Sequence, residues 1–298
     1  MEFLLNSFFA TAKLKIAIIF VGLIFILSIT NLSAQTNSEK PKRIVSINLC
    51  TDQLLMALVE TERIISVSHL ARDSSISRFS DKAKNLHINY GMAEEIYLLK
   101  PDLVLAGEYS KKYVVAVIRE LGLNIVTVPV ANSLEAMRNN LLKLAAILGE
   151  EAKAKIIISK VDNLFSLKNT YSKKPVAIVW RTRGLIDGPG TLVHEMLQVH
   201  GFRNLAKNLG RGQLGNINLE QIIMTRPDLV IIPEPKNGYP SLSQLVFKHP
   251  ALTSLDQLNK PWLTIIRFPE WGLMCGGPQV LKAYELLASI RMNILTKK

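Results

Sequence analysis

The sequence has few of the residues that build metal centres or disulfide frameworks. Only two cysteines occur in 298 residues, Cys50 and Cys275, and 225 positions separate them. Neither has a histidine close by in the sequence that would mark it as a nucleophile. The histidines are dispersed and none shows the spacing of metal ligands; they are His69, His87, His194, His200 and His249. The sequence therefore predicts no metal site and no cysteine-based catalysis.

Motifs of other enzymes are missing as well. No Gly-x-Ser-x-Gly elbow occurs. The segment 194–198 begins as His-Glu but carries Gln198 where a zinc protease requires its second histidine. The segment 188–191 lacks the lysine of a phosphate-binding loop, so we interpret it as a turn with Thr191 as the N-cap of a helix. These absences disfavour catalysis, and a secreted enzyme on an α/β scaffold is kept as the alternative.

No apolar run is long enough to span a bilayer. The run from Ile16 to Ile29 has 14 residues, against roughly 20 for a spanning helix. It follows Lys13 and Lys15 and ends in a small-residue site at Ala34, which is the layout of a cleaved signal peptide over residues 1–34. The residue after this site is glutamine and not the cysteine of a lipoprotein. We expect a periplasmic protein that is not a lipoprotein, with a polar leader over residues 35–42.

Long clusters of one charge are also absent. The formal net charge is +12, but the basic residues are scattered and do not alternate with aromatic residues. This pattern indicates a solvated surface and gives no support to nucleic-acid binding.

The rest of the chain alternates short β-rich apolar runs with amphipathic stretches, which is typical of an α/β fold with mostly parallel sheets. We predict an N-terminal α/β lobe over residues 43–148, a connector helix over 149–174 and a second α/β lobe over 175–298. The expected strands are 43–47, 64–67, 103–106 and 125–128, then 176–180, 229–232 and 263–266. The expected helices are 52–58, 93–99 and 111–121, two between 133 and 167 with a break at Gly149, and a closing helix over 279–290.

An internal repeat supports two similar lobes. Glu94 lies seven residues before Pro101, and Glu220 lies seven residues before Pro227. In each copy a short helix, a proline stop and a buried strand are expected, and the copies are offset by 126 residues. Lobes built alike would face each other across a cleft, which is where open α/β sheets bind ligands.

Residues that follow the predicted strands should line this cleft. Two tryptophans and a tyrosine among a few polar groups suit a bulky, flat and partly apolar ligand, although core packing is an equal interpretation for Trp180. The candidate ligand-binding residues are Asn48, Leu49, Cys50, His69, Tyr109, Trp180, Arg181, Arg183 and Trp271.

These features resemble the helical-backbone family of periplasmic binding proteins for ferric siderophores, haem and cobalamin. The resemblance runs from about Lys42 to the C-terminus. It is carried by the segments 43–46, 51–54, 94–104, 190–193 and 220–230, which are specific together and weak singly.

The resemblance implies a non-catalytic protein that hands a metal chelate to the permease dimer of an ATP-binding-cassette (ABC) importer. It also implies that Glu94 and Glu220 dock onto the permease. We also expect a monomer without a cofactor. Trp271 resembles an aromatic position of cobalamin binders, whereas Arg181 and Arg183 suit ferric chelates or haem propionates. We expect cobalamin, with a ferric siderophore or haem as alternatives. Whether Cys50 and Cys275 pair is left open, but a bridge would tether the two lobes.

Overall fold

The computed structural model describes residues 39–166, 172–235, 242–257 and 263–296. The predicted signal peptide, with Lys13, Lys15 and the cleavage site after Ala34, lies outside these ranges, as do residues 167–171 of the predicted connector. Within the described ranges, no helix combines the length and the apolar character needed to cross a membrane.

Residues 44–128 form a parallel five-stranded sheet in the order β3-β2-β1-β4-β5. Its three inner strands, β2, β1 and β4, are short and mostly apolar runs, as expected for strands buried on both faces. The elements are β1 (Ile44–Ser46), α2 (Leu49–Leu58), β2 (Ile64–Ser68), α3 (Ser80–Ala83), β3 (His87–Asn89), α4 (Ala93–Leu98), β4 (Leu103–Gly107), α5 (Lys112–Glu120) and β5 (Ile125–Val128).

The second half contains a parallel four-stranded sheet in the order β11-β10-β6-β8 and a small antiparallel pair, β7-β9. Its strands are β6 (Val176–Val179), β7 (Leu185–Asp187), β8 (Arg203–Asn204), β9 (Leu214–Asn216), β10 (Leu229–Pro233) and β11 (Thr264–Phe268). Its helices are α8 (Leu192–Val199), α9 (Leu205–Asn208), α10 (Leu219–Thr225), α11 (Pro250–Gln257) and α12 (Val280–Thr296).

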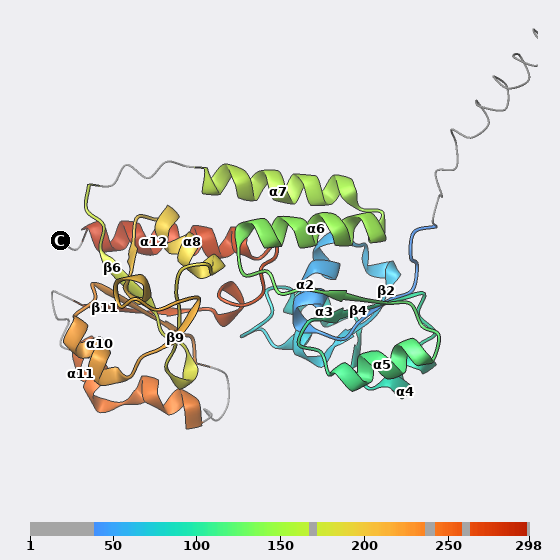
Figure 1. Ribbon diagram of the computed structural model, residues 1–298, viewed down its shortest axis with the longest axis horizontal. Coiled ribbons are helices and arrows are strands. Elements are labelled where there is room, and N and C mark those ends of the chain that lie inside the picture. Colours follow the sequence, from blue (N-terminus) through green and yellow to red (C-terminus); the bar gives the residue numbers. More distant parts are fainter. Residues whose placement is uncertain (1–38, 167–171, 236–241, 258–262, 297–298) are drawn as a thin grey trace, which may run out of the picture. The chain divides into compact units, whose positions relative to one another are not determined.

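Two antiparallel helices lie between the sheets in sequence, α6 (Leu134–Leu148) and α7 (Glu151–Phe165), and they run side by side (Figure 1). Ser133 caps α6, since its hydroxyl accepts a hydrogen bond from the backbone N–H of Ala136 at 3.1 Å. Gly149 ends α6 with a φ of +69°, a conformation that costs glycine little. The helix break predicted at Gly149 is therefore confirmed.

One hydrophobic cluster joins the two halves. It includes Ile44 and Leu103 from the first sheet, Leu141 from α6, and Val179 and Leu229 from the second sheet. Residues 40–298 accordingly form one compact unit. The predicted architecture of two α/β halves is confirmed, whereas the exact boundaries at 148/149 and 174/175 stay predictions.

The opposite face of each sheet has a cluster of its own. Ala93 and Ile96 of α4 pack on the first sheet with α5. Leu219 and Ile222 of α10 pack on the second sheet with residues of α9 and α11. Helices therefore cover both faces of each sheet, as parallel strands require.

Candidate ligand cleft

A cavity of about 430 Å³ lies where the carboxyl ends of strands from both sheets meet. Its walls come from the segments after β1, β4, β5, β6 and β7, from α8, and from residues 272–276 after β11. This is the position at which open α/β sheets bind ligands. Both halves of the repeat thus contribute to a single site.

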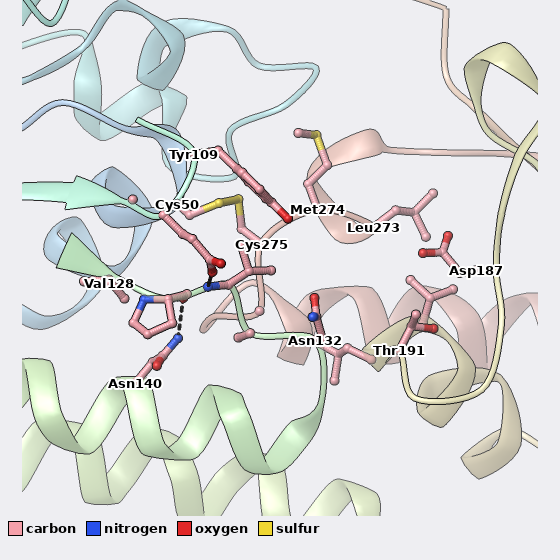
Figure 2. Close-up of a pocket in the computed structure, with 18 of the residues that line it drawn as sticks. Cys50, Tyr109, Val128, Asn132, Asn140, Asp187, Thr191, Leu273, Met274 and Cys275 are labelled. Atoms are coloured by element: carbon pink, nitrogen blue, oxygen red, sulfur yellow. Dashed lines mark hydrogen bonds between the residues drawn. A yellow bond between two sulfur atoms is a disulfide. The ribbon is translucent and has the colours of Figure 1, made fainter. Parts of the chain in front are cut away.

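The first half contributes Asn48 and Tyr109 to the cavity wall, and Figure 2 shows Tyr109. Asn48 caps α2, because its Oδ1 accepts a hydrogen bond from the backbone N–H of Cys50 at 2.9 Å. A Cβ at Gly107 would lie 2.5 Å from that oxygen, so glycine is needed where β4 ends beside the cap. Tyr109 is 83% exposed and projects from the end of β4.

A disulfide between Cys50 and Cys275 forms part of the cavity wall (Figure 2). Their Cα atoms are 5.2 Å apart, within the range that a disulfide allows. The bridge links the start of α2 to the loop after β11, so it crosses between the two halves. Cys50 and Cys275 are therefore paired, a point that the sequence left open.

The loop that carries Cys275 is held from several sides. The guanidinium of Arg181 donates a hydrogen bond to the carbonyl of Leu273, and the amide of Gln279 donates to the carbonyl of Cys275. A Cβ at Gly276 would lie 2.5 Å from the Cβ of Ala131. The loop therefore has little freedom beside the cavity.

Arg181 also forms a buried ion pair. Its Nε lies 2.8 Å from Oδ2 of Asp187, and the Asp187 side chain is 6% exposed. Burial raises the pKa of the Asp187 carboxyl, and the Arg181 guanidinium partly offsets this rise. The pair leaves the positive charge of Arg181 largely neutralised at the cavity wall.

Four of the predicted site residues line this cavity, namely Asn48, Cys50, Tyr109 and Arg181. Leu49, their neighbour in sequence, does not, because its side chain is buried in the first turn of α2.

Trp180 lies in the core and not in the cavity wall. It is 1% exposed, its Nε1 donates a hydrogen bond to the carbonyl of Ile217 at 3.1 Å, and its ring packs edge-on against Phe247. The predicted strand 176–180 ends at Val179, and Trp180 forms an isolated bridge with Ile186 of β7. The antiparallel pair β7-β9 was not predicted, and Ile186 of β7 and Ile217 just after β9 pack with Trp180 in one hydrophobic cluster.

Three further predicted residues lie outside the cavity. His69 is exposed at the end of β2 and stacks on Tyr90 with 5.0 Å between ring centroids. Arg183 occupies a tight turn with a φ of +61°. Trp271 lines a second hollow, where the guanidinium of Arg78 lies 5.6 Å from its ring centroid.

Sequence reasoning missed three polar residues of the wall. Asp187 lies at the end of β7 and Gln213 just before β9, two strands that were not predicted, and Asn132 precedes the cap of α6. The Gly-Pro-Gly turn at 188–190 was the available indication that a strand ends at Asp187. Thr191 was predicted as an N-cap, and this is confirmed, because its hydroxyl accepts from the N–H of His194 at 3.1 Å.

The described part of the chain holds no cluster of three or more histidine, cysteine, aspartate or glutamate side chains that could bind a metal ion. The cavity offers apolar contact from Leu192, Met196 and Met274 and neutral hydrogen-bonding groups from Asn132 and Gln213. This combination suits reversible binding of an organic molecule.

Two α/β halves that share one cavity are an arrangement typical of binding proteins. The family model described as "periplasmic binding protein" matches residues 44–256, and the chain belongs to this family. Family membership confirms the predicted class, a binding protein and not an enzyme.

Among curated proteins, the chain is 25% identical over 210 residues to an uncharacterized ABC transporter substrate-binding lipoprotein of Bacillus subtilis, covering 66% of this chain and 65% of that protein. It is 20% identical to a cobalamin-binding protein of Halobacterium salinarum, covering 67% and 56% respectively. The chain thus spans less than two thirds of the length of these relatives.

Among solved structures, the fold resembles that of a periplasmic haem-binding protein from Roseiflexus sp. RS-1 in its apo form. The TM-score is 0.66 at 22% identity, covering 86% of this chain and 98% of that one.

Proposed function

We propose that this protein is the periplasmic substrate-binding component of an ABC importer and that its cavity binds cobalamin or a related corrinoid. The main observation in favour of this ligand is the composition of the cavity wall. Among its described lining residues, Arg181 is the only lysine or arginine, and its charge is paired with Asp187. The remaining polar groups include the neutral amides of Asn132 and Gln213 and the carboxylate of Glu108, which accepts a hydrogen bond from the N–H of Val130 at 2.8 Å.

Neutral amides suit a corrinoid, because its ring carries amide side chains that donate and accept hydrogen bonds without a net charge. The apolar wall and Met274 suit the faces of a flat ring. A corrinoid is larger than a cavity of about 430 Å³. Only one edge of the ring would therefore enter, and the remainder would extend beyond the rim beside Tyr109. The cobalamin-binding relative in Halobacterium salinarum supports the same choice.

Haem is the second candidate, and a ferric siderophore the third. The phenol of Tyr109, 83% exposed at the rim, is a suitable oxygen donor for ferric iron, and the structural neighbour from Roseiflexus is named a haem-binding protein. Against both stands the neutralisation of Arg181, because haem propionates and anionic ferric chelates bind best to an unpaired guanidinium.

Absorbance titration of the purified protein with cyanocobalamin, haemin and a ferric hydroxamate tests the proposal. We expect saturable, one-to-one binding of cyanocobalamin with a Kd between roughly micromolar and nanomolar. Tyr109→Ala and Asn132→Ala should weaken binding, and Trp271→Ala, outside the cavity, is the matched control. Saturable binding of haemin alone would replace cobalamin by haem, and binding of none would refute the proposal.

We further propose that Glu94 and Glu220 dock the protein onto the permease. Both side chains are exposed, and each lies in the first turn of its helix, α4 or α10. Glu95 is a matched control, because its carboxylate accepts a hydrogen bond from the N–H of Tyr90 at 2.8 Å and serves the local structure. Reversal of both charges, Glu94→Arg with Glu220→Arg, should abolish uptake at unchanged ligand affinity and thermal stability. Uptake that survives this reversal would remove the docking role.

We also propose that the protein is exported through a cleaved signal peptide. The mature protein would then be a monomer in the periplasm without a lipid anchor. This proposal rests on the sequence of residues 1–34 and on the absence of a cysteine at position 35. The Bacillus subtilis relative is named a lipoprotein, so the anchor is the point to check. Mass spectrometry of the mature protein would show an N-terminus at Gln35, whereas an added acyl mass would contradict it.

A further inference from the structure

The second hollow, which contains Trp271, is separate from the ligand cavity. Its volume is about 520 Å³, which lies in the range of small-molecule sites. Its walls come from residues 74–81 after β2, from Glu234 after β10, from residues 266–271 at the end of β11, and from α12. Both halves of the chain therefore build it, and its lining residues differ throughout from those of the cavity.

Part of the lining is apolar. Phe268 is buried in the hydrophobic cluster that joins the two halves. Ile266 of β11 and Leu286 and Ile290 of α12 pack against that cluster and keep part of their surface exposed. They also line the hollow, so they offer contact to the body of an organic molecule.

The same hollow contains an arginine without a counter-charge. The guanidinium of Arg78 lies over the ring of Trp271, 5.6 Å from its centroid, which is within reach of a cation–π contact. Among the described residues, no carboxylate lies within ion-pair distance of this guanidinium. A guanidinium held over a ring keeps the N–H donors in its own plane, and two of these match the two oxygens of a carboxylate. Trp271 therefore holds Arg78 ready for an anion.

A buried hydroxyl beside Arg78 lacks a hydrogen-bond partner. Ser77 is 1% exposed and lines the hollow, and its Oγ has no partner among the described residues. The same holds for Nε2 of Gln53, whose Oε1 accepts a hydrogen bond from the backbone N–H of Arg78 at 3.0 Å. Buried polar groups of native proteins are almost always hydrogen-bonded, and rotation about the Cα–Cβ bond reorients a serine hydroxyl. The wall around Arg78 thus has donors that suit a ligand with acceptor oxygens.

The remaining charges favour a ligand with one negative charge. Asp81 and Lys282 line the hollow, but each forms an ion pair with a residue outside it, at 2.6 and 2.8 Å. Arg267 and Glu234 contribute one charge of each sign. Arg78 is left as the excess positive charge, which suits a monoanion. A dianion such as phosphate would be repelled by the two carboxylates of the wall.

We propose that the second hollow is a binding site for a small organic carboxylate with an apolar or aromatic body. The carboxylate accepts hydrogen bonds from the guanidinium of Arg78 and the hydroxyl of Ser77, and the body lies on the apolar side chains of β11 and α12. The site is additional to the proposed corrinoid site and does not depend on which ligand the cavity binds.

Isothermal titration calorimetry of the purified mature protein with 3-phenylpropionate tests the site. We expect one-to-one binding with a Kd of about 1 mM or lower. The amine of the same body, 2-phenylethylamine, and inorganic phosphate should not bind. Arg78→Ala should weaken binding of 3-phenylpropionate about tenfold or more. Arg119→Ala is the matched control, because it removes an exposed guanidinium from α5, outside the hollow.

Three further variants separate binding from folding and one site from the other. Ser77→Ala should weaken binding of 3-phenylpropionate and leave the midpoint of thermal unfolding of the free protein equal or higher, because it removes a buried hydroxyl that has no partner. Trp271→Ala should weaken binding of 3-phenylpropionate and leave cyanocobalamin affinity unchanged. Tyr109→Ala should do the reverse.

Several results would overturn the site. They are the absence of saturable binding of 3-phenylpropionate, unchanged binding by Arg78→Ala, and an equal loss for Arg119→Ala. Binding of the amine or of phosphate as tight as that of 3-phenylpropionate would refute a site for monocarboxylates. A lower unfolding midpoint for Ser77→Ala would assign that hydroxyl to the fold, and displacement of 3-phenylpropionate by cyanocobalamin would make the hollow part of the cavity site. The titration with 3-phenylpropionate gives its answer whether or not cyanocobalamin binds, so failure of the proposed function is a separate result.

Discussion

Removal of the disulfide between Cys50 and Cys275 should destabilise the protein mainly through the unfolded chain. The bridge closes a loop of 225 residues. The entropy of closing such a loop corresponds to about 5 kcal/mol at 25 °C, which is an upper value because engineered and natural bridges commonly deliver less. Cys50→Ser with Cys275→Ser should therefore lower the free energy of unfolding by up to about 5 kcal/mol.

Urea denaturation followed by circular dichroism measures this change. The slope m should rise in the double variant, because an unfolded chain without the cross-link is more expanded. Reduction of the unmodified protein should reproduce both effects and is the control for the substitutions themselves. The bridge also joins the two halves beside the cavity, so cyanocobalamin affinity should fall on reduction. An unchanged urea midpoint after reduction, or two thiol labels on the unreduced unfolded protein, would refute this reasoning.

Three further predictions concern the core and the cavity wall. Asp52 is buried on α2, where its carboxylate accepts hydrogen bonds from the N–H and the hydroxyl of Ser68. Burial raises the pKa of Asp52 to about 7, so the folded state binds a proton more tightly than the unfolded state and stability should fall from about pH 4 to about pH 7. The free energy of unfolding should fall by on the order of 4 kcal/mol. Asp52→Asn should abolish this fall in urea titrations at pH values across this range. If the free energy of unfolding of the variant depends on pH as before, the fall does not arise from Asp52. Arg181→Leu should cost about 3 to 5 kcal/mol, since it leaves Asp187 buried and unpaired, and Asp187→Asn in the same background should recover part of that loss. Trp180→Ala should lower the midpoint of thermal unfolding, at a cost of about 3 to 5 kcal/mol, and leave ligand affinity unchanged, whereas a loss of affinity without a loss of stability would return Trp180 to the ligand site.

Local signals in the sequence were enough to predict most of the strands. Short, mostly apolar runs predicted β1, β2, β4, β5, β6, β10 and β11 within a few residues of their observed bounds, because parallel strands covered by helices have nearly continuous apolar sequences. Gly149 marked the end of α6 because a left-handed residue there favours glycine. The repeat of 126 residues predicted two similar halves, since equal spacing from glutamate to proline reflects the same helix, stop and strand.

Which loops meet depends on how the whole chain packs. Trp180 follows β6, and the sequence left the cleft and the core as equal interpretations for it. The antiparallel pair β7-β9 packs over it, and neither strand had a long enough apolar run to be recognised. Trp271 follows β11, yet it faces the second hollow beside Arg78 while its neighbours at 272–276 reach the cavity. Local patterns show that a residue ends a strand. They do not show the direction of the next turn of chain, and that direction decides whether the side chain meets ligand, core or solvent.

The pairing of the cysteines depends on the same distinction. Cys50 was predicted after the first strand of one half and Cys275 after the last strand of the other. The distance between them depends on how the two sheets pack through the cluster they share, which no local pattern encodes. In the folded chain that packing brings their Cα atoms to 5.2 Å. The ion pair of Arg181 with Asp187 arises in the same way, and it converts an expected anion-binding arginine into a neutralised part of the cavity wall.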